Sequence, residues 1–478
     1  MYFWVIFWCF RQKLFIFVFL IRVNHRIAIV LVKEVFVCYY RMEYEFRDGE
    51  NSMKIEQYQL SNGMNVILEP ISGIHSAAFG VWVKVGSVDE NKENNGIAHM
   101  IEHMIFKGTS HYSAKQIADM TAEIGGNLDA YTSKECTSFY GWVLKENLSK
   151  TIWLLADMLK NSLFKQEDLE NEKDIVKEEI DMYNDSAEDV VHEMLQKCIW
   201  KEHPLGYLIS GEKEVIENFT GKDLKKFHHD YYTAENMILS LAGNFDVTEI
   251  KKELEEAFGT WKAKGKEHNA SIPIFTPCLY TQDKDIEQLH LNIAYDSISS
   301  VSEERYAFSI LNAILGGGAN SRLFLKVREE MGIAYAIYSY GSSFFHTGLF
   351  HIYAGLNANR LEETIEVIQK EILKLKKEGP TKEEMLWAKE QIKTDLIIHA
   401  ESTKGHMSSN ARELMQFGKA VPLEETLHQI NQVKREDIFD CLERYFKPEK
   451  MAIAFAGNLE QVSAELKTWK GIQNIIVS

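Results

Sequence analysis

The stretch YYTAENMILSLAGNFD at residues 231–246 occurs a second time in this chain, as YFKPEKMAIAFAGNLE at residues 445–460. Six pairs of positions are identical without a gap, and the members of each pair lie 214 residues apart. These pairs are Tyr231/Tyr445, Glu235/Glu449, Met237/Met451, Ala242/Ala456, Gly243/Gly457 and Asn244/Asn458. Solenoid repeats are only about 20 to 50 residues long. A unit of this length therefore predicts two homologous domains.

The join between the domains is predicted in residues 262–278, KAKGKEHNASIPIFTPC, which are polar, rich in lysine and contain two prolines. This places the domains at 53–265 and 278–478, with a linker at 266–277. Strand patterns at 76–88 and 129–144 mix with helical spacing at 148–161, 167–183 and 361–377. Because the two types do not strictly alternate, we expect an α+β fold, each domain an antiparallel sheet flanked by helices.

Composition narrows the possible functions. The chain has 478 residues, of which 45% are hydrophobic, and its net charge is -17. Nucleic acids and anionic membranes are bound through accumulated Lys and Arg, so neither is an expected partner. Six widely spaced cysteines without a CxxC pair indicate neither a thiolate zinc site nor a disulfide framework. They favour a reducing compartment, and we expect the cytoplasm.

The first forty residues are rich in aromatic side chains. Their charges split them into apolar runs shorter than the roughly 18 to 20 residues that cross a bilayer; the charged residues are Arg11, Lys13, Arg22, Arg26 and Lys33. We interpret residues 1–52 as an N-terminal extension outside the fold, with Met53 as the start, because the Gly49-Glu50 codons can spell a ribosome-binding sequence. The alternative is a membrane-associating hairpin.

A candidate metal motif lies in NNGIAHMIEHMIFKGT, residues 94–109. On a helix, His99 and His103 are one turn apart on one face, and Glu102 lies beside them. Two neutral imidazoles suit zinc, which in catalytic sites takes three protein ligands and a water. Glu102 is placed to accept the proton of that water. The alternative is a pair of hydrogen-bonded histidines on a half-buried helix.

A third ligand is offered by ENEKDIVKEEIDMY, residues 170–183. Glu172 and Glu179 are seven residues apart, so they share one face of a helix. The alternative is a solvent-exposed charged helix, which is the more common structure for a segment so rich in charged residues.

HMIEHMIFKGT followed by NEKDIVKEEI resembles the pitrilysin and insulinase family of zinc metallopeptidases. It is most similar to the branch of mitochondrial processing peptidase and short bacterial enzymes, and the resemblance covers Met53 to about residue 470. It implies one Zn²⁺ per chain, with His99, His103 and Glu179 as ligands and Glu102 as the base. Glu172 would support catalysis. Glu179 stands 76 residues after His103, which is the spacing of that branch, and the alternative ligand is the adjacent Glu178.

At the repeat offset, the second domain has Ala313, Gly316, Gly317 and Lys393 in place of the motif residues, so it lacks a metal site. The resemblance instead assigns it an Arg and a Tyr seven residues apart that hold substrate, here Arg328 and Tyr335. Both side chains donate hydrogen bonds to a carbonyl or an oxyanion. The alternative is a surface Arg beside a half-buried Tyr.

DAYTSKE, residues 129–135, resembles the edge strand on which the family binds an extended peptide as an added strand. Ala130 and Thr132 would lie along this substrate-binding edge.

Together these features predict a zinc endopeptidase that hydrolyses unfolded peptides or presequence-like segments. The resemblance implies that two domains face each other as a clamshell around a chamber, and that the protein is a homodimer. Two alternatives are a non-catalytic or chaperone-like subunit and a peptide-binding module with a structural zinc. The first is disfavoured because the metal motif and the Arg/Tyr pair occur in one chain. Glu102 argues against the second, because a structural site needs no general base and is closed by a fourth protein ligand.

Overall fold

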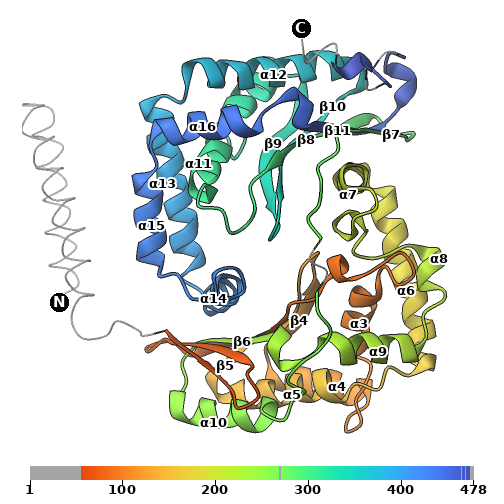
Figure 1. The fold of residues 1–478 in the computed structure, drawn as a ribbon, viewed down its shortest axis with the longest axis vertical. Coiled ribbons are helices and arrows are strands. Elements are labelled where there is room, and N and C mark those ends of the chain that lie inside the picture. The colour runs from red at the N-terminus through yellow and green to blue at the C-terminus, as the bar shows by residue number, and fades with distance from the viewer. Residues whose placement is uncertain (1–54, 269–270, 465, 469, 474–478) are drawn as a thin grey trace, which may run out of the picture. The chain divides into compact units, whose positions relative to one another are not determined.

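The computed structural model describes residues 55–268, 271–464, 466–468 and 470–473. The N-terminal extension predicted for residues 1–52 lies outside this range. From Ile55 onward the chain forms one compact unit that contains two β-sheets, each with its own hydrophobic core. The helices and strands are labelled in Figure 1.

The first sheet has six strands in the order β1-β2-β6-β3-β5-β4. They are β1 (Glu56–Gln59), β2 (Asn65–Pro70), β3 (Ser76–Val83), β4 (Asn127–Thr132), β5 (Thr137–Leu144) and β6 (Met237–Gly243). The helices of this half are α3 (Ile97–Ile105), α4 (Ala114–Ile124), α5 (Leu148–Asn161), α6 (Gln166–Asp185), α7 (Ala187–Trp200), α8 (Lys213–Ile216), α9 (Gly221–Tyr231) and α10 (Val247–Phe258).

The second sheet has five strands in the order β7-β11-β8-β10-β9. They are β7 (Leu279–Asp283), β8 (Gln288–Ser297), β9 (Ala334–Ser343), β10 (Gly348–Asn357) and β11 (Met451–Gly457). Its helices are α11 (Arg305–Leu315), α12 (Leu361–Glu378), α13 (Lys382–His399), α14 (Thr403–Phe417), α15 (Leu423–Gln432) and α16 (Arg435–Tyr445), and η5 (Phe324–Glu330) is a short π-helix.

The repeated stretch forms the same strand in both halves, β6 in the first and β11 in the second. All seven residues of each strand are buried, which explains their continuous apolar sequence, because both faces of these strands are covered. β6 pairs in parallel with β2, and β11 with β7, whereas all other neighbours are antiparallel. The expected antiparallel sheets thus each contain one parallel pair.

The two halves exchange a helix. α7 of the first half packs on β8 and β11 of the second sheet, and α14 of the second half packs on β6, β3 and β2 of the first (Figure 1). Small side chains allow this close approach. Ala294, Ala452, Ala454 and Ala456 line the strands under α7, and Ala78 and Ala242 those under α14. Each half therefore completes the other's core.

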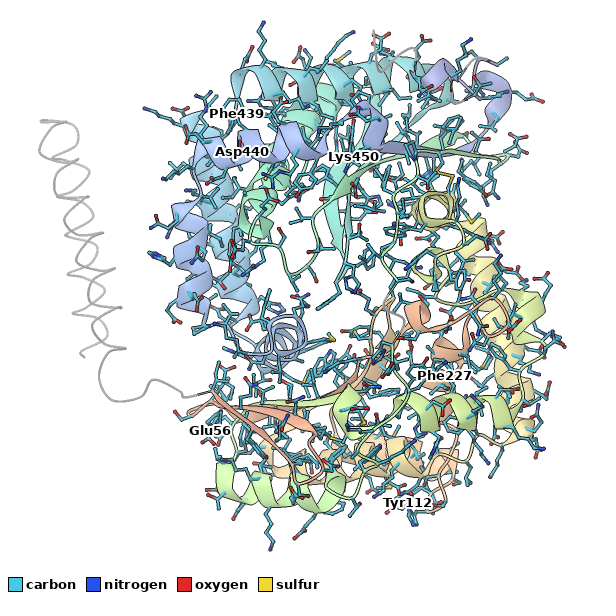
Figure 2. The ribbon with its side chains drawn as sticks, in the orientation of Figure 1. Glu56, Tyr112, Phe227, Phe439, Asp440 and Lys450 are labelled. Atoms are coloured by element: carbon cyan, nitrogen blue, oxygen red, sulfur yellow. A yellow bond between two sulfur atoms is a disulfide. The ribbon has the colours of Figure 1, made fainter. Side chains whose placement is uncertain are left out.

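Cys198 on α7 and Cys278 just before β7 form a disulfide, drawn as a yellow bond in Figure 2, with their Cα atoms 6.2 Å apart. This corrects the expectation of no disulfide. The partners lie 80 residues apart and meet only because α7 packs against the second sheet. The cysteines therefore give no support to a reducing compartment.

Among the described residues, no helix has the length and hydrophobicity of a membrane span.

Candidate metal centre

α3 presents the candidate metal residues on one face and core residues on the other. The buried core side chains are Ile97, Met100, Ile101, Met104 and Ile105. His99, Glu102 and His103 lie on the opposite side and are buried or half-buried. The helix begins after Gly96, whose φ of +96° is the left-handed conformation that glycine adopts without strain. A side chain there would also collide with the backbone of Ser210 and Gly211.

A buried carboxylate secures the start of α3. Glu90 is only 4% exposed, and its Oε2 accepts hydrogen bonds from Gly96 N and Asn95 Nδ2, both at 2.8 Å. Its Oε1 accepts from Ala98 N at 2.9 Å. Burial raises the pKa of Glu90 to about 7, although these donors oppose the rise. Glu90 thus satisfies amides that a helix leaves unpaired at its N-terminus.

The structure brings His99, His103 and Glu179 together. Oε2 of Glu179 on α6 lies 3.8 Å from His99 Nε2 and 3.7 Å from His103 Nε2. A tetrahedral zinc with bonds of about 2.0 to 2.2 Å sets its ligand atoms roughly 3.3 to 3.6 Å apart. Both observed spacings, 3.7 and 3.8 Å, lie within about 0.2 Å of this range, and the His, His and Glu donors are ones that zinc takes. In the described part of the chain these three residues are the one such cluster of His, Cys, Asp or Glu.

Charges around the two histidines differ. Burial, together with the neighbouring His103, lowers the pKa of His99 to about 3, so His99 is neutral near pH 7 as a metal ligand must be. Burial also acts to lower the pKa of His103, but Glu172 and the other nearby carboxylates outweigh it and raise that pKa. Glu172 Oε2 is 3.0 Å from His103 Nδ1, and Lys107 pairs with the other oxygen. Glu172 therefore holds the ring of His103 through Nδ1.

The carboxylate of Glu102 is hydrogen-bonded to β4. Its Oε2 accepts a hydrogen bond from Thr132 Oγ1 at 2.5 Å. Burial raises the pKa of Glu102, and the hydrogen bond from Thr132 partly offsets this rise. A raised pKa makes a carboxylate a better proton acceptor near neutral pH. Ala130, two residues earlier on β4, packs against the hydrophobic core instead.

Arg328 and Tyr335 also meet. Arg328 lies on η5 with its guanidinium carbon 5.5 Å from the ring centre of Tyr335 and 4.8 Å from that of Phe324. Tyr335, at the start of β9, is 74% exposed. Both side chains are thus open to a ligand. Within the described residues, no hydrogen bond or ion pair links either of them to the three metal-site residues.

The structure also places Glu178, the alternative third ligand, and Lys393, which replaces Glu179 in the second domain. Glu178 is exposed on α6, away from the histidines that Glu179 approaches. Lys393 on α13, at the position equivalent to Glu179, pairs with Glu390 at 2.6 Å.

Three features of the site are absent from the sequence analysis: Glu90, Lys107 and the role of Thr132 beside Glu102. Lys107 lies two residues beyond the end of α3 and pairs with Glu172 on α6, a contact that nothing in the local sequence indicates. Glu90 is separated from α3 by a loop, and nothing in its local sequence indicates where its side chain points.

Comparison with family models gives two matches. Residues 65–213 match a model described as "Insulinase (Peptidase family M16)", and residues 218–392 match one described as "Peptidase M16 inactive domain". All three metal-site residues lie within the first match, and Arg328 and Tyr335 lie within the second.

Individual relatives align over most of their length. The chain is 40% identical to the "Uncharacterized zinc protease YmxG" of Bacillus subtilis, over 85% of this chain and 99% of that protein. It is 35% identical to an "Uncharacterized zinc protease" of Rickettsia felis, over 81% and 94%. A crystal structure of a protease from Helicobacter pylori matches with a TM-score of 0.79 and 25% identity, over 84% of this chain and 99% of that one. A Pseudomonas fluorescens structure titled as a peptidase M16 inactive domain shares the fold, with a TM-score of 0.79 at 20% identity.

Proposed function

The chain belongs to the insulinase family, peptidase family M16, and from this premise we propose that it is a zinc-dependent endopeptidase acting on unfolded peptides or presequence-like segments. The observation that carries the proposal is one cluster on two helices. His99, His103 and Glu179 would hold the ion, and Glu102 stands beside them on α3. Zinc, when bound, would polarise a carbonyl and lower the pKa of its bound water to about 7.

The residues of the chain supply the remaining chemistry. Glu102 takes the proton of the attacking water, since its burial raises its pKa toward the pH at which it works. Glu172 holds the ring of His103 through Nδ1, which leaves Nε2 near Glu179 and available as the atom that would bind the ion.

Substrate binding is assigned to both halves. β4 is the outermost strand of its sheet, so an extended peptide can pair with it through backbone hydrogen bonds. Arg328 and Tyr335 in the second half would donate hydrogen bonds to a peptide carbonyl or to the oxyanion. The two halves would enclose the chamber in which the peptide is cleaved, and the active form would be a homodimer.

The rival proposal, a peptide-binding subunit with a structural zinc, is disfavoured by the donor set. Structural zinc sites are closed by four protein ligands. The cluster here has three, counted over the residues that the structure describes. The "inactive domain" description covers residues 218–392, which exclude the cluster.

The test is Glu102→Gln, with hydrolysis of a quenched fluorescent peptide and zinc content measured on the same samples. We expect zinc to be retained and kcat to fall by about 10²- to 10⁴-fold, because the amide cannot accept the proton. Glu123→Gln, an exposed carboxylate on α4, is the control and should behave as wild type. Near-normal turnover in zinc-loaded Glu102→Gln would refute the assignment.

A further inference from the structure

We propose that Thr132 is a positioning residue that holds the carboxylate of Glu102 and ties it to the edge strand β4. The inference rests on the proposed function, and it gives Thr132 a role other than the substrate contact expected from sequence. Its hydroxyl donates to Glu102 Oε2 at 2.5 Å, across 30 residues of chain.

The strand directs this hydroxyl toward the helix. Along β4 the odd-numbered side chains are exposed, whereas Leu128, Ala130 and Thr132 alternate with them on the more buried face. Leu128 and Ala130 pack against the core on that face, and β4 contacts α3. Thr132 is the last residue of the strand, and on this same face its side chain contacts Glu102 of the candidate metal centre instead of the core.

The hydrogen bond leaves one carboxylate oxygen for chemistry. Within the described residues, Thr132 is the one hydrogen-bond donor to Glu102, and it contacts Oε2. The carboxylate of the half-buried Glu102 is thereby held through Oε2, with Oε1 available to a water. Because Thr132 also belongs to the outer strand, a peptide that pairs with β4 lies next to the residue that fixes the base. Binding and base orientation are then coupled through one residue.

The test compares Thr132→Val, which replaces the hydroxyl with a methyl group of similar size, and Thr132→Ser, which keeps the hydroxyl. We expect Thr132→Val to lower kcat about tenfold or more, with KM changed by less than about twofold and zinc content unchanged. Thr132→Ser should restore most of the lost turnover. A residue that only contacts substrate would instead change KM, and valine would be tolerated.

Thr137→Val is the matched control. Thr137 faces Thr132 across the β4–β5 pair, and its hydroxyl donates to the carbonyl of Val85 at 2.9 Å. The same exchange there should lower the melting temperature and leave kcat unchanged. If Thr132→Val proves unfolded, Thr132→Ala serves as the second variant without a hydroxyl, and it should show the same loss of kcat.

A double variant isolates the mechanism. Adding Thr132→Val to Glu102→Gln should lower the residual turnover by less than about twofold, because the group that Thr132 orients is already inactive. Equal kcat for wild type and Thr132→Val, or a full further loss in the Glu102→Gln background, would overturn the role of Thr132. Absence of hydrolysis by zinc-loaded wild type would overturn the proposed function itself.

Discussion

At the scale of single residues, the metal site depends on which of two adjacent glutamates turns toward the histidines. Successive residues on a helix point about 100° apart. Glu179 therefore approaches His99 and His103, whereas Glu178 faces solvent. Both residues are glutamates, so their chemistry does not show which one is the ligand. The way α6 packs against α3 determines which one faces the histidines.

We predict that Glu179→Gln weakens zinc binding strongly, because it replaces a charged ligand at a three-ligand site. The matched exchange Glu178→Gln should leave zinc affinity within about twofold of wild type. Zinc competition with a chelating dye would measure both dissociation constants. If Glu178→Gln were the variant that lost zinc, α6 would be shifted by one residue from the register seen here.

At the scale of elements, α14 docks on the first sheet through a buried polar contact as well as through apolar packing. Glu69 on β2 is 7% exposed, and its carboxylate accepts from Asn410 Nδ2 at 2.6 Å. His406 Nδ1 is 3.0 Å from the other oxygen of Glu69. The hydrogen bond to Glu69, opposed by burial, raises the pKa of His406 above 6.5.

This contact predicts a pH dependence of stability. A histidine pKa that is higher in the folded state stabilises the fold below the unfolded pKa, and this contribution is lost as pH rises through the folded pKa. His406→Ala should therefore destabilise the protein by roughly 1.5 to 3 kcal/mol near pH 6 and by less near pH 9. Denaturant unfolding at the two pH values would measure it. His428→Ala, at an exposed site on α15, should show no such difference.

At the scale of the whole molecule, the exchanged helices make the two halves interdependent. Residues 53–265 include α7, whose apolar side chains Val190, Val191, Leu195 and Ile199 belong to the cluster packed on the second sheet. The same segment lacks α14, which covers part of the first sheet. A boundary between the halves in the sequence is therefore not a boundary between two independent cores.

We predict that residues 53–265 and 275–478, expressed separately, are inactive and aggregate, because each exposes an apolar face that the other covers. Expressed together they should copurify and hydrolyse peptide. The control is the full chain with a protease site placed in the 266–277 linker, which should stay assembled and active after cutting. A monodisperse first half with full activity by itself would contradict this interdependence and the substrate role of Arg328 and Tyr335.

Sequence by itself determined the features that depend on local periodicity or on self-similarity. The helical spacing of His99, Glu102 and His103 places them together whatever surrounds them, and α3 forms as that spacing predicts. The 214-residue repeat predicted two related sheets, and β6 and β11 are the strands that it encodes.

Tertiary structure decided what depends on contacts between distant segments. Three features join residues whose separation in sequence carries no signal: the bond from Thr132 to Glu102, the disulfide between Cys198 and Cys278, and the exchange of α7 and α14. A local pattern sets which face of an element is apolar. Which element covers that face is decided by the packing of the whole chain, because any apolar surface of matching shape satisfies the same pattern.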